Sequence, residues 1–354
     1  MQNKKIVVLD HGNSDLMENK IFNPDLAKKV SHTILPTCYL YQEAQKQGIQ
    51  FVTSDIFLGL KEKPKNTLLM SHLKTAYTEK LIFQGAKPII LTCQESPVIA
   101  THFYINLKKI SSLYKHSFVF EGMKKRLSKK TIYHQTFFVQ PYNFEDFKFL
   151  EFKNKKFLTM ISSAKDLKNY KKIIKTLILK LMYSKEIKEI YSERIKAIKF
   201  FSQKTNFDLF GFGWGKKKFD KFTNLAIKKT YRETISDKLE TLRNYKFALC
   251  FENAVFEGYI TEKIFDAMFA GCVPIYYGAP DIKKYIPENA FIGLREFKNY
   301  EELNDYLHSI NEEQYQEYLK NIQKFLSSEQ YYKFSQEYFA KEILNILNQE
   351  FFRI

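Results

Sequence analysis

A group of polar residues in the second half of the chain has the residue types and spacing needed to bind a charged ligand. The group stands between two apolar runs, 246–251 and 273–277, and consists of Glu252, Asn253, Tyr259, Glu262 and Lys263. An ammonium group in the first turn of a helix attracts phosphate, because the helix dipole and free backbone N–H groups act in the same direction. Glu262 would repel phosphate and suits sugar hydroxyls instead. The group therefore predicts a site for a diphosphate that carries a sugar.

The apolar runs on either side are the elements that must position these residues. Continuous apolar runs are typical of strands in a parallel sheet that is covered on both faces. A helix is expected to open near residues 261–263, so the stretch 245–280 predicts a strand–helix–strand unit. In such units the ligand binds beyond the carboxyl ends of the strands, where the helix begins. The polar group falls at that place.

Two distant residues could complete the chemistry. Glu95 directly follows a buried run, 88–93, and precedes a turn proline and a predicted helix at 99–114. Arg194 lies on a predicted helix at 191–204 and could give a phosphate two parallel hydrogen bonds. Structural interpretations stay open for both residues. Glu95 could interact with a helix dipole, and Arg194 could form a salt bridge, just as Lys263 could be an ordinary surface lysine.

Other ligand motifs are absent from the sequence. Gly211, Gly213 and Gly215 precede Lys216, but the spacing fits neither a P-loop nor a dinucleotide fingerprint. This segment is either a turn over a ligand or a plain turn. The sequence contains no D-x-D, so no metal–diphosphate site of the aspartate type is expected. The helix dipole, lysine and arginine would have to replace the metal.

The chain of 354 residues is long enough for two domains, and strands alternate with helices in both halves. We predict an α/β protein with an N-terminal domain at 1–150, a C-terminal domain at 151–328 and a terminal helix at 329–354. Predicted strands include 4–10, 49–58, 88–93, 157–163 and 207–212, and predicted helices include 76–84, 299–310, 312–326 and 330–352. The aromatic face of the terminal helix is expected to pack back across the domains.

The net charge of +17 suggests an anionic partner. Only six of the 56 basic residues are arginines, the residue type that most often reads bases and phosphates in nucleic acids, which disfavours a nucleic-acid partner. A peripheral contact with the inner membrane surface is an open alternative. No apolar run is long enough to span a bilayer and no signal-peptide pattern is present, so a cytoplasmic location is expected. The four scattered cysteines are predicted to be core residues rather than disulfide or zinc ligands.

A family resemblance joins these observations. The stretch FENAVFEGYITEKIFDAMFAGCVPIYYGAP resembles the signature of glycosyltransferase family ten, the α-1,3/α-1,4-fucosyltransferases, and the likeness continues to PENAFIGLREF at 287–297. Glu95-Ser96-Pro97 and the pattern from 160 to 213 are weaker matches. Ala254 departs from the family motif, which usually has Ser or Thr there.

The resemblance implies a bacterial-type enzyme with a GT-B fold, in which two Rossmann-like domains face each other across a cleft. It implies an inverting, metal-independent transfer of fucose from GDP-β-L-fucose to a hydroxyl, expected to be O3, of an N-acetylglucosamine or glucose unit in a surface glycan. No cofactor is expected, and the partners would be the donor and a glycan acceptor. By motif position, Lys263 and Arg194 would bind the diphosphate, while Asn253, Tyr259 and Glu262 would hold the ribose and sugar. Glu95 would be the general base.

Two other functions stay open on the sequence alone. The first is a GT-B glycosyltransferase with another nucleotide-sugar donor, since the residues define a diphosphate site more firmly than a sugar site. The second is a non-enzymatic basic protein that binds nucleic acid or a membrane.

Overall fold

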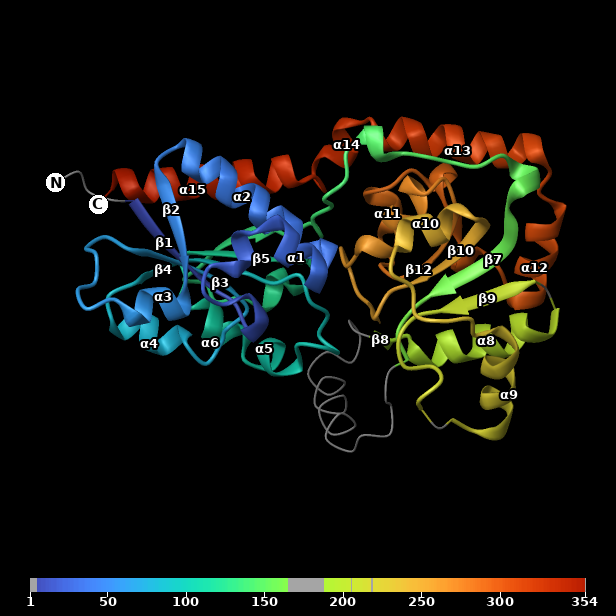
Figure 1. Cartoon of the computed structure of the whole chain (residues 1–354), viewed down its shortest axis with the longest axis horizontal. Coiled ribbons are helices and arrows are strands. Elements are labelled where there is room, and N and C mark those ends of the chain that lie inside the picture. The colour runs from blue at the N-terminus through green and yellow to red at the C-terminus, as the bar shows by residue number, and fades with distance from the viewer. Residues whose placement is uncertain (1–4, 165–187, 205, 218, 354) are drawn as a thin grey trace. The chain divides into compact units, whose positions relative to one another are not determined.

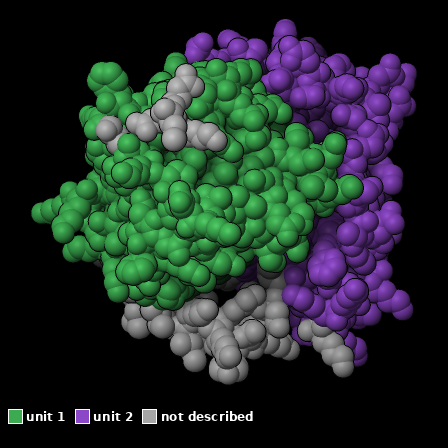
Figure 2. All heavy atoms as spheres, turned by 60° about the vertical axis from the view of Figure 1, so that its left-hand side comes forward, with its two compact units in different colours: residues 1–141, 332–354 green, residues 142–331 purple. Residues whose placement is uncertain are grey.

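The chain folds into two compact units. The structure is a computed structural model that describes residues 5–164, 188–204, 206–217 and 219–353. The first unit comprises Met1–Pro141 and Tyr332–Ile354, and the second comprises Tyr142–Tyr331 (Figure 2). The sequence predicts domain boundaries after residues 150 and 328. In the structure, the boundaries between the units fall after residues 141 and 331. Segment 142–150 joins the second unit, where the Lys148 N–H donates to the Phe269 carbonyl at 3.1 Å.

The first unit is built on a six-stranded parallel sheet with the order β2-β1-β3-β4-β5-β6 (Figure 1). Its strands are β1 Lys5–Asp10, β2 Ile49–Thr53, β3 Leu68–His72, β4 Lys87–Thr92, β5 His116–Val119 and β6 Ile132–Gln135. The predicted strand at 49–58 is wrong in its second half, because α3 (Ser54–Gly59) follows β2 without a loop. The sequence did not predict β3, which is only five residues long.

Helices alternate with these strands, and the C-terminal helix completes the core of the unit. The helices are α1 Pro24–Val30, α2 Leu35–Lys46, α3, α4 Thr78–Phe83, α5 Thr101–Ile105, α6 Leu107–Ser111 and α15 Gln336–Phe352. Helix α15 runs beside α2, and its Ile343 and Leu347 share a buried cluster with Leu40 (Figure 1). The single helix predicted at 330–352 is two helices, α14 (Glu329–Tyr332) and α15. Ser335 separates them by capping α15, since its side chain accepts from the Tyr338 N–H at 3.1 Å.

The second unit has a five-stranded parallel sheet with the order β13-β12-β10-β7-β9. These strands are β7 Lys156–Ile161, β9 Phe207–Phe210, β10 Tyr245–Phe251, β12 Val273–Tyr277 and β13 Ile292–Gly293, and the two-residue strands β8 Lys188–Glu189 and β11 Ala254–Val255 pair separately. Its helices are α8 Tyr191–Lys204, α9 Lys221–Thr230, α10 Lys238–Arg243, α11 Glu262–Phe269, α12 Tyr300–Ser309, α13 Glu312–Leu326 and α14. The predicted strand–helix–strand unit is confirmed as β10, α11 and β12, with β10 in the middle of the sheet.

The glycine-rich segment after β9 is a tightly packed turn. Gly211 has a φ of +120°, and a Cβ atom there would overlap the Ser162 carbonyl that follows β7. The Trp214 indole donates to the same carbonyl at 2.6 Å. Only glycine allows both this backbone conformation and this close approach, so packing between the ends of β7 and β9 explains the glycine.

All four cysteines are buried and free, as the sequence predicts. Burial raises the pKa of the Cys93 and Cys272 thiols to about 12. These thiols are therefore protonated at neutral pH and behave as small apolar side chains.

Candidate functional site

The predicted polar group lies where β10 ends and α11 begins. Strands β10 and β12 run parallel, with Phe251 opposite Tyr277, so both carboxyl ends reach the same edge of the sheet. The Glu252 N–H donates to the Tyr277 carbonyl at 2.9 Å and extends this pairing by one residue. Glu252 is thus held rigidly just beyond the sheet. Its carboxylate organises the start of α11.

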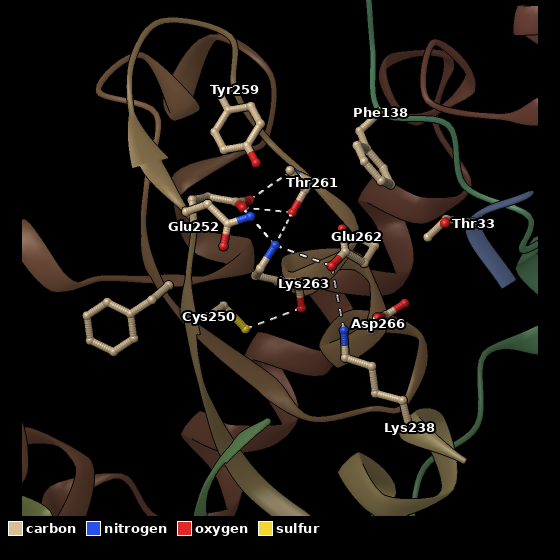
Figure 3. Close-up of polar contacts among 12 residues, drawn as sticks. Thr33, Phe138, Lys238, Cys250, Glu252, Tyr259, Thr261, Glu262, Lys263 and Asp266 are labelled. Atoms are coloured by element: carbon tan, nitrogen blue, oxygen red, sulfur yellow. Dashed lines mark hydrogen bonds and ion pairs between the residues drawn. The ribbon is translucent and has the colours of Figure 1, made fainter. Parts of the chain in front are cut away.

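Glu252 is fully buried, and its side chain bonds to the first residues around α11 (Figure 3). One carboxylate oxygen accepts from the Thr261 N–H at 2.7 Å, and the other accepts from the Thr261 hydroxyl at 2.7 Å and from Lys263 Nζ at 3.1 Å. Thr261 stands at the N-cap position of α11, but its side chain makes no capping hydrogen bond. The N-terminal N–H groups of α11 are therefore not capped by Thr261 and suit an anion.

Lys263 is held by three oxygens. Besides Glu252, its ammonium contacts the Thr261 hydroxyl at 2.6 Å and Glu262 Oε1 at 3.2 Å. Burial alone lowers the pKa of Lys263, but the two carboxylates outweigh burial and raise it. Lys263 is therefore a charged ammonium at neutral pH, and a phosphate that binds it has to share or replace one of these oxygens.

The sequence did not predict two charged residues that extend the cluster. Lys238 on α10 contacts Asp266 Oδ2 at 2.5 Å and lies 4.0 Å from Glu262 Oε1 (Figure 3). Asp266 is fully buried on α11, one turn after Glu262. The i, i+4 spacing of Glu262 and Asp266 places both on one helix face, which is the signal that could have revealed Asp266. No sequence signal points to Lys238.

Arg194 approaches the same loop from α8, with only 3% of its surface exposed. One terminal nitrogen donates to the carbonyls of Phe251 at 2.8 Å and Glu252 at 2.6 Å, and to Asn253 Oδ1 at 3.0 Å. Burial lowers the pKa of Arg194, although an arginine of this kind stays charged at neutral pH. The structure thus brings Arg194 and Asn253 together and ties α8 to the loop after β10.

Tyr259 and Gly278 complete the surroundings of Glu252. The Tyr259 ring is buried and stacked on Phe256, with ring centroids 4.6 Å apart, while its carbonyl accepts from the Tyr276 hydroxyl at 3.3 Å. A Cβ atom at Gly278 would collide with the Glu252 side chain and with that hydroxyl. Glycine at 278 therefore lets the end of β12 approach the buried carboxylate closely.

The charge of Glu262 leads to a prediction about acid stability. Burial by itself raises the pKa of Glu262, but Lys263 and Lys238 outweigh it and bring the pKa to about 2, from an ordinary value of 4.5. A carboxyl whose pKa is lower in the folded state stabilises the protein above its unfolded pKa, and this contribution is lost as the pH falls from 4.5 through 2. The ionised Glu262 carboxylate thus contributes at most about 3 kcal/mol to the free energy of unfolding.

Unfolding by denaturant at several pH values between 7 and 3 measures this contribution. We expect the free energy of unfolding to fall less steeply below pH 4.5 in Glu262→Gln than in the native protein. The exposed residue Glu313 supplies the control, since Glu313→Gln should keep the native pH dependence. Equal slopes for Glu262→Gln and the native protein would contradict the role of Lys263 and Lys238.

Glu95 lies in the first unit, three residues after the end of β4. It lines a cavity of about 870 Å³ together with hydroxyl, amide and imidazole side chains, among them His11, His72 and Thr75. Burial lowers the pKa of His72 to about 4, so this imidazole is neutral at pH 7. Among the described residues, the charged side chains that line the cavity are Lys74 and Glu95. This lining suits an uncharged, hydroxyl-rich ligand.

The buried carboxylate of Asp10 orders one wall of this cavity. It accepts from the hydroxyls of Thr75 and Thr78, both at 2.6 Å, and from those of Ser54 at 3.0 Å and Ser71 at 3.3 Å. Leu73, at the start of the same loop, has a φ of +64°, an uncommon conformation for leucine. The hydrogen bonds to Asp10 hold this loop against the cavity.

The described residues contain no group of three or more His, Cys, Asp or Glu side chains placed to hold a metal ion. In the same part of the chain, no helix is long and apolar enough to cross a membrane.

A comparison with protein families concerns most of the second unit and the start of α15. Residues 175–346 match the family model described as "Glycosyltransferase family 10 (fucosyltransferase) C-term". This region of the chain is similar to the C-terminal part of glycosyltransferase family 10. It contains Arg194 and the whole cluster around Glu252, whereas Glu95 lies outside it.

Individual fucosyltransferases match a shorter segment of the chain. The α-(1,3)-fucosyltransferase FucT of Helicobacter pylori is 42% identical over 82 residues, which are 23% of this chain and 17% of that protein. The GDP-fucose protein O-fucosyltransferase 3 of Bos taurus is also 42% identical over 82 residues, 22% of this chain and 17% of that protein. The chain thus covers less than a fifth of either relative.

The fold has counterparts among solved structures. The solved structure of Anabaena Alr3699/HepE in complex with UDP and glucose matches 97% of this chain and 99% of its own, with a TM-score of 0.55 and 10% identity. The predicted α/β GT-B fold and the resemblance to family 10 are confirmed. The individual roles predicted for Glu95 and for the five residues of the second unit remain predictions.

Proposed function

We propose that this protein transfers L-fucose from GDP-β-L-fucose to a sugar hydroxyl, O3 of an N-acetylglucosamine or glucose unit in a surface glycan. The observation that carries the proposal is the charged cluster at the start of α11, which lies inside the region matched by the fucosyltransferase family model. An ammonium at a helix N-terminus that the N-cap side chain leaves uncapped is suited to a diphosphate leaving group.

In the proposed reaction the acceptor oxygen attacks the anomeric carbon of fucose as the bond from that carbon to the diphosphate breaks. Attack on the opposite face converts the β-linked donor to an α-linked product. Glu95 takes the proton of the acceptor hydroxyl, which typically contributes about 10²–10⁴-fold to a rate. Lys263 and the N–H groups of α11 stabilise the negative charge that develops on the departing GDP.

The remaining donor residues have supporting or contacting roles in this proposal. Arg194 fixes the loop that carries Glu252 and Asn253, since one of its terminal nitrogens donates to three oxygens of that loop. Glu262 lies beside Lys263 and suits the hydroxyls of ribose or fucose rather than the phosphates. The transfer proposed here uses no metal ion. A cytoplasmic location and a contact with the inner membrane surface remain predictions from sequence.

Nucleotide binding tests the choice of donor. Isothermal calorimetry with GDP, UDP and ADP should show GDP binding at least about tenfold more tightly than the other two, equivalent to about 1.4 kcal/mol. A preference for UDP or ADP would favour a glycosyltransferase with another nucleotide sugar. Binding of none of the three, together with salt-sensitive binding of nucleic acid or anionic vesicles, would favour a non-enzymatic basic protein.

A further inference from the structure

A second pocket in the first unit has the features of a sugar-binding site. The pocket, of about 340 Å³, lies between the segment that follows β6 and helix α15, and we call it the outer pocket. Its lining includes Tyr133, His134, Phe137, Lys333, Tyr338 and Glu342. Aromatic rings offer flat apolar surfaces to the C–H faces of a sugar, while charged and amide groups can bind its hydroxyls.

The aromatic side chains of the outer pocket are held in place by one another. The Phe137 ring packs edge-on against Tyr338, with centroids 6.2 Å apart, and against Phe334 at 5.1 Å. The His134 ring stacks on Phe118 at 4.5 Å. Rings fixed in this way lose little conformational freedom on binding, so they form a preorganised surface.

The outer pocket carries little net charge. His134 contacts His116 at 2.9 Å, and burial lowers the pKa of both imidazoles, that of His116 to about 4. Both rings are therefore neutral at pH 7. Among the described residues, the charged lining side chains are Lys333 and Glu342, one of each sign. The chemistry favours a neutral sugar over an acidic one.

The outer pocket adjoins the cavity that contains Glu95. Val139 and Phe339 line both, so the two spaces share a wall. The Gln94 side chain, next to Glu95, donates to the Phe137 carbonyl at 3.3 Å and links the two linings directly. The outer pocket is therefore the neighbouring site for a chain of sugars that has one residue in the cavity.

We infer that the outer pocket is a second subsite for a neutral oligosaccharide, which binds a sugar distal to the one that accepts fucose in the cavity beside Glu95. This inference rests on the proposed function for the identity of the cavity's ligand. It adds that acceptors long enough to reach the outer pocket bind more tightly than short ones.

Acceptor length and variants of the outer pocket test the subsite. For the native protein, KM should be about fivefold lower for a neutral N-acetyllactosamine hexasaccharide than for the disaccharide, the effect of about one aromatic contact. Tyr338→Ala should remove this difference and leave the disaccharide KM unchanged. Lys333 is exposed, so Lys333→Ala should preserve the fold and reduce the difference in KM between the two acceptors. Lys341 is an exposed lysine of α15 outside the pocket, so Lys341→Ala should leave this difference unchanged.

Direct binding separates failure of the subsite from failure of the proposed function. Saturation-transfer NMR with the hexasaccharide should show weaker binding to Tyr338→Ala and Lys333→Ala than to the native protein and Lys341→Ala. Transfer to no acceptor would overturn the proposed function, and the subsite would then stand or fall on this binding measurement. Equal binding of disaccharide and hexasaccharide to the native protein, or an undiminished length preference in both variants, would overturn the subsite.

Discussion

Replacing Lys263 by methionine is expected to weaken GDP binding by about 100-fold. A hydrogen bond between charged groups is worth about 1.5–3 kcal/mol, and the charge lost here stands at the N-terminus of α11, where the helix dipole also attracts the diphosphate. Calorimetric titration of GDP into the variant measures the effect. Lys196→Met provides a matched control, because Lys196 is an exposed lysine in a surface pair with Glu193.

The same substitution should also destabilise the protein. Lys263 is the ammonium in contact with the fully buried carboxylate of Glu252, at 3.1 Å, and removal of one partner from a buried ion pair typically costs about 3–5 kcal/mol. Loss of GDP binding could then reflect local unfolding. The double variant Glu252→Gln/Lys263→Met removes both charges and keeps an oxygen for the Thr261 N–H.

Stability and binding should therefore separate in the double variant. We expect it to regain most of the stability lost in Lys263→Met but none of the GDP affinity. A Lys263→Met protein that binds GDP within twofold of the native affinity would contradict the role of Lys263. Recovery of GDP binding in the double variant would mean that Lys263 acts only through the structure of the loop.

Replacing Glu95 by glutamine is expected to lower kcat for fucosyl transfer by about 10²–10⁴-fold, the usual contribution of a general base. Glutamine has nearly the same shape as glutamate but cannot take a proton from the acceptor hydroxyl. GDP affinity should stay within twofold, because Glu95 lies in the first unit and outside the cluster around Glu252. Single-turnover rates and calorimetry on the same sample measure both quantities.

Glu62→Gln is the control for this experiment, since Glu62 is exposed and does not line the cavity beside Glu95. It should leave the rate and the affinity unchanged. If Glu95→Gln retains the native kcat, another group must accept the proton. If it loses GDP affinity as well, Glu95 acts on the donor rather than on the acceptor.

The stretch around β10, α11 and β12 could be predicted closely from the sequence, because two continuous apolar runs enclose a helix with polar residues at its start. The sequence does not predict strand β3, because its five residues follow a Lys/Pro-rich segment and show no clear alternation of apolar and polar side chains. The sequence predicts strand where helix α3 lies, because Ile56 and Phe57 continue the apolar run of β2. Local patterns fail where short elements follow one another without a turn residue.

Partners within the site were harder to predict than its position. The contact between Lys238 and Asp266 depends on the packing of α10 against α11, which no local pattern encodes. The carbonyls that bind Arg194 belong to the backbone and leave no signal in residue types. Sequence therefore identified residues that could bind a diphosphate, whereas the structure adds the buried carboxylates and carbonyls that hold them.

The most direct test of the proposed function is a transfer assay with GDP-fucose and a panel of lactose and N-acetyllactosamine acceptors, with linkage analysis of the products. The proposal predicts an α-fucosylated product linked to O3 of the glucose or N-acetylglucosamine unit, formed by the native protein and strongly reduced in both Lys263→Met and Glu95→Gln. Absence of any fucosylated product, or equal product formation by the native protein and both variants, would contradict it.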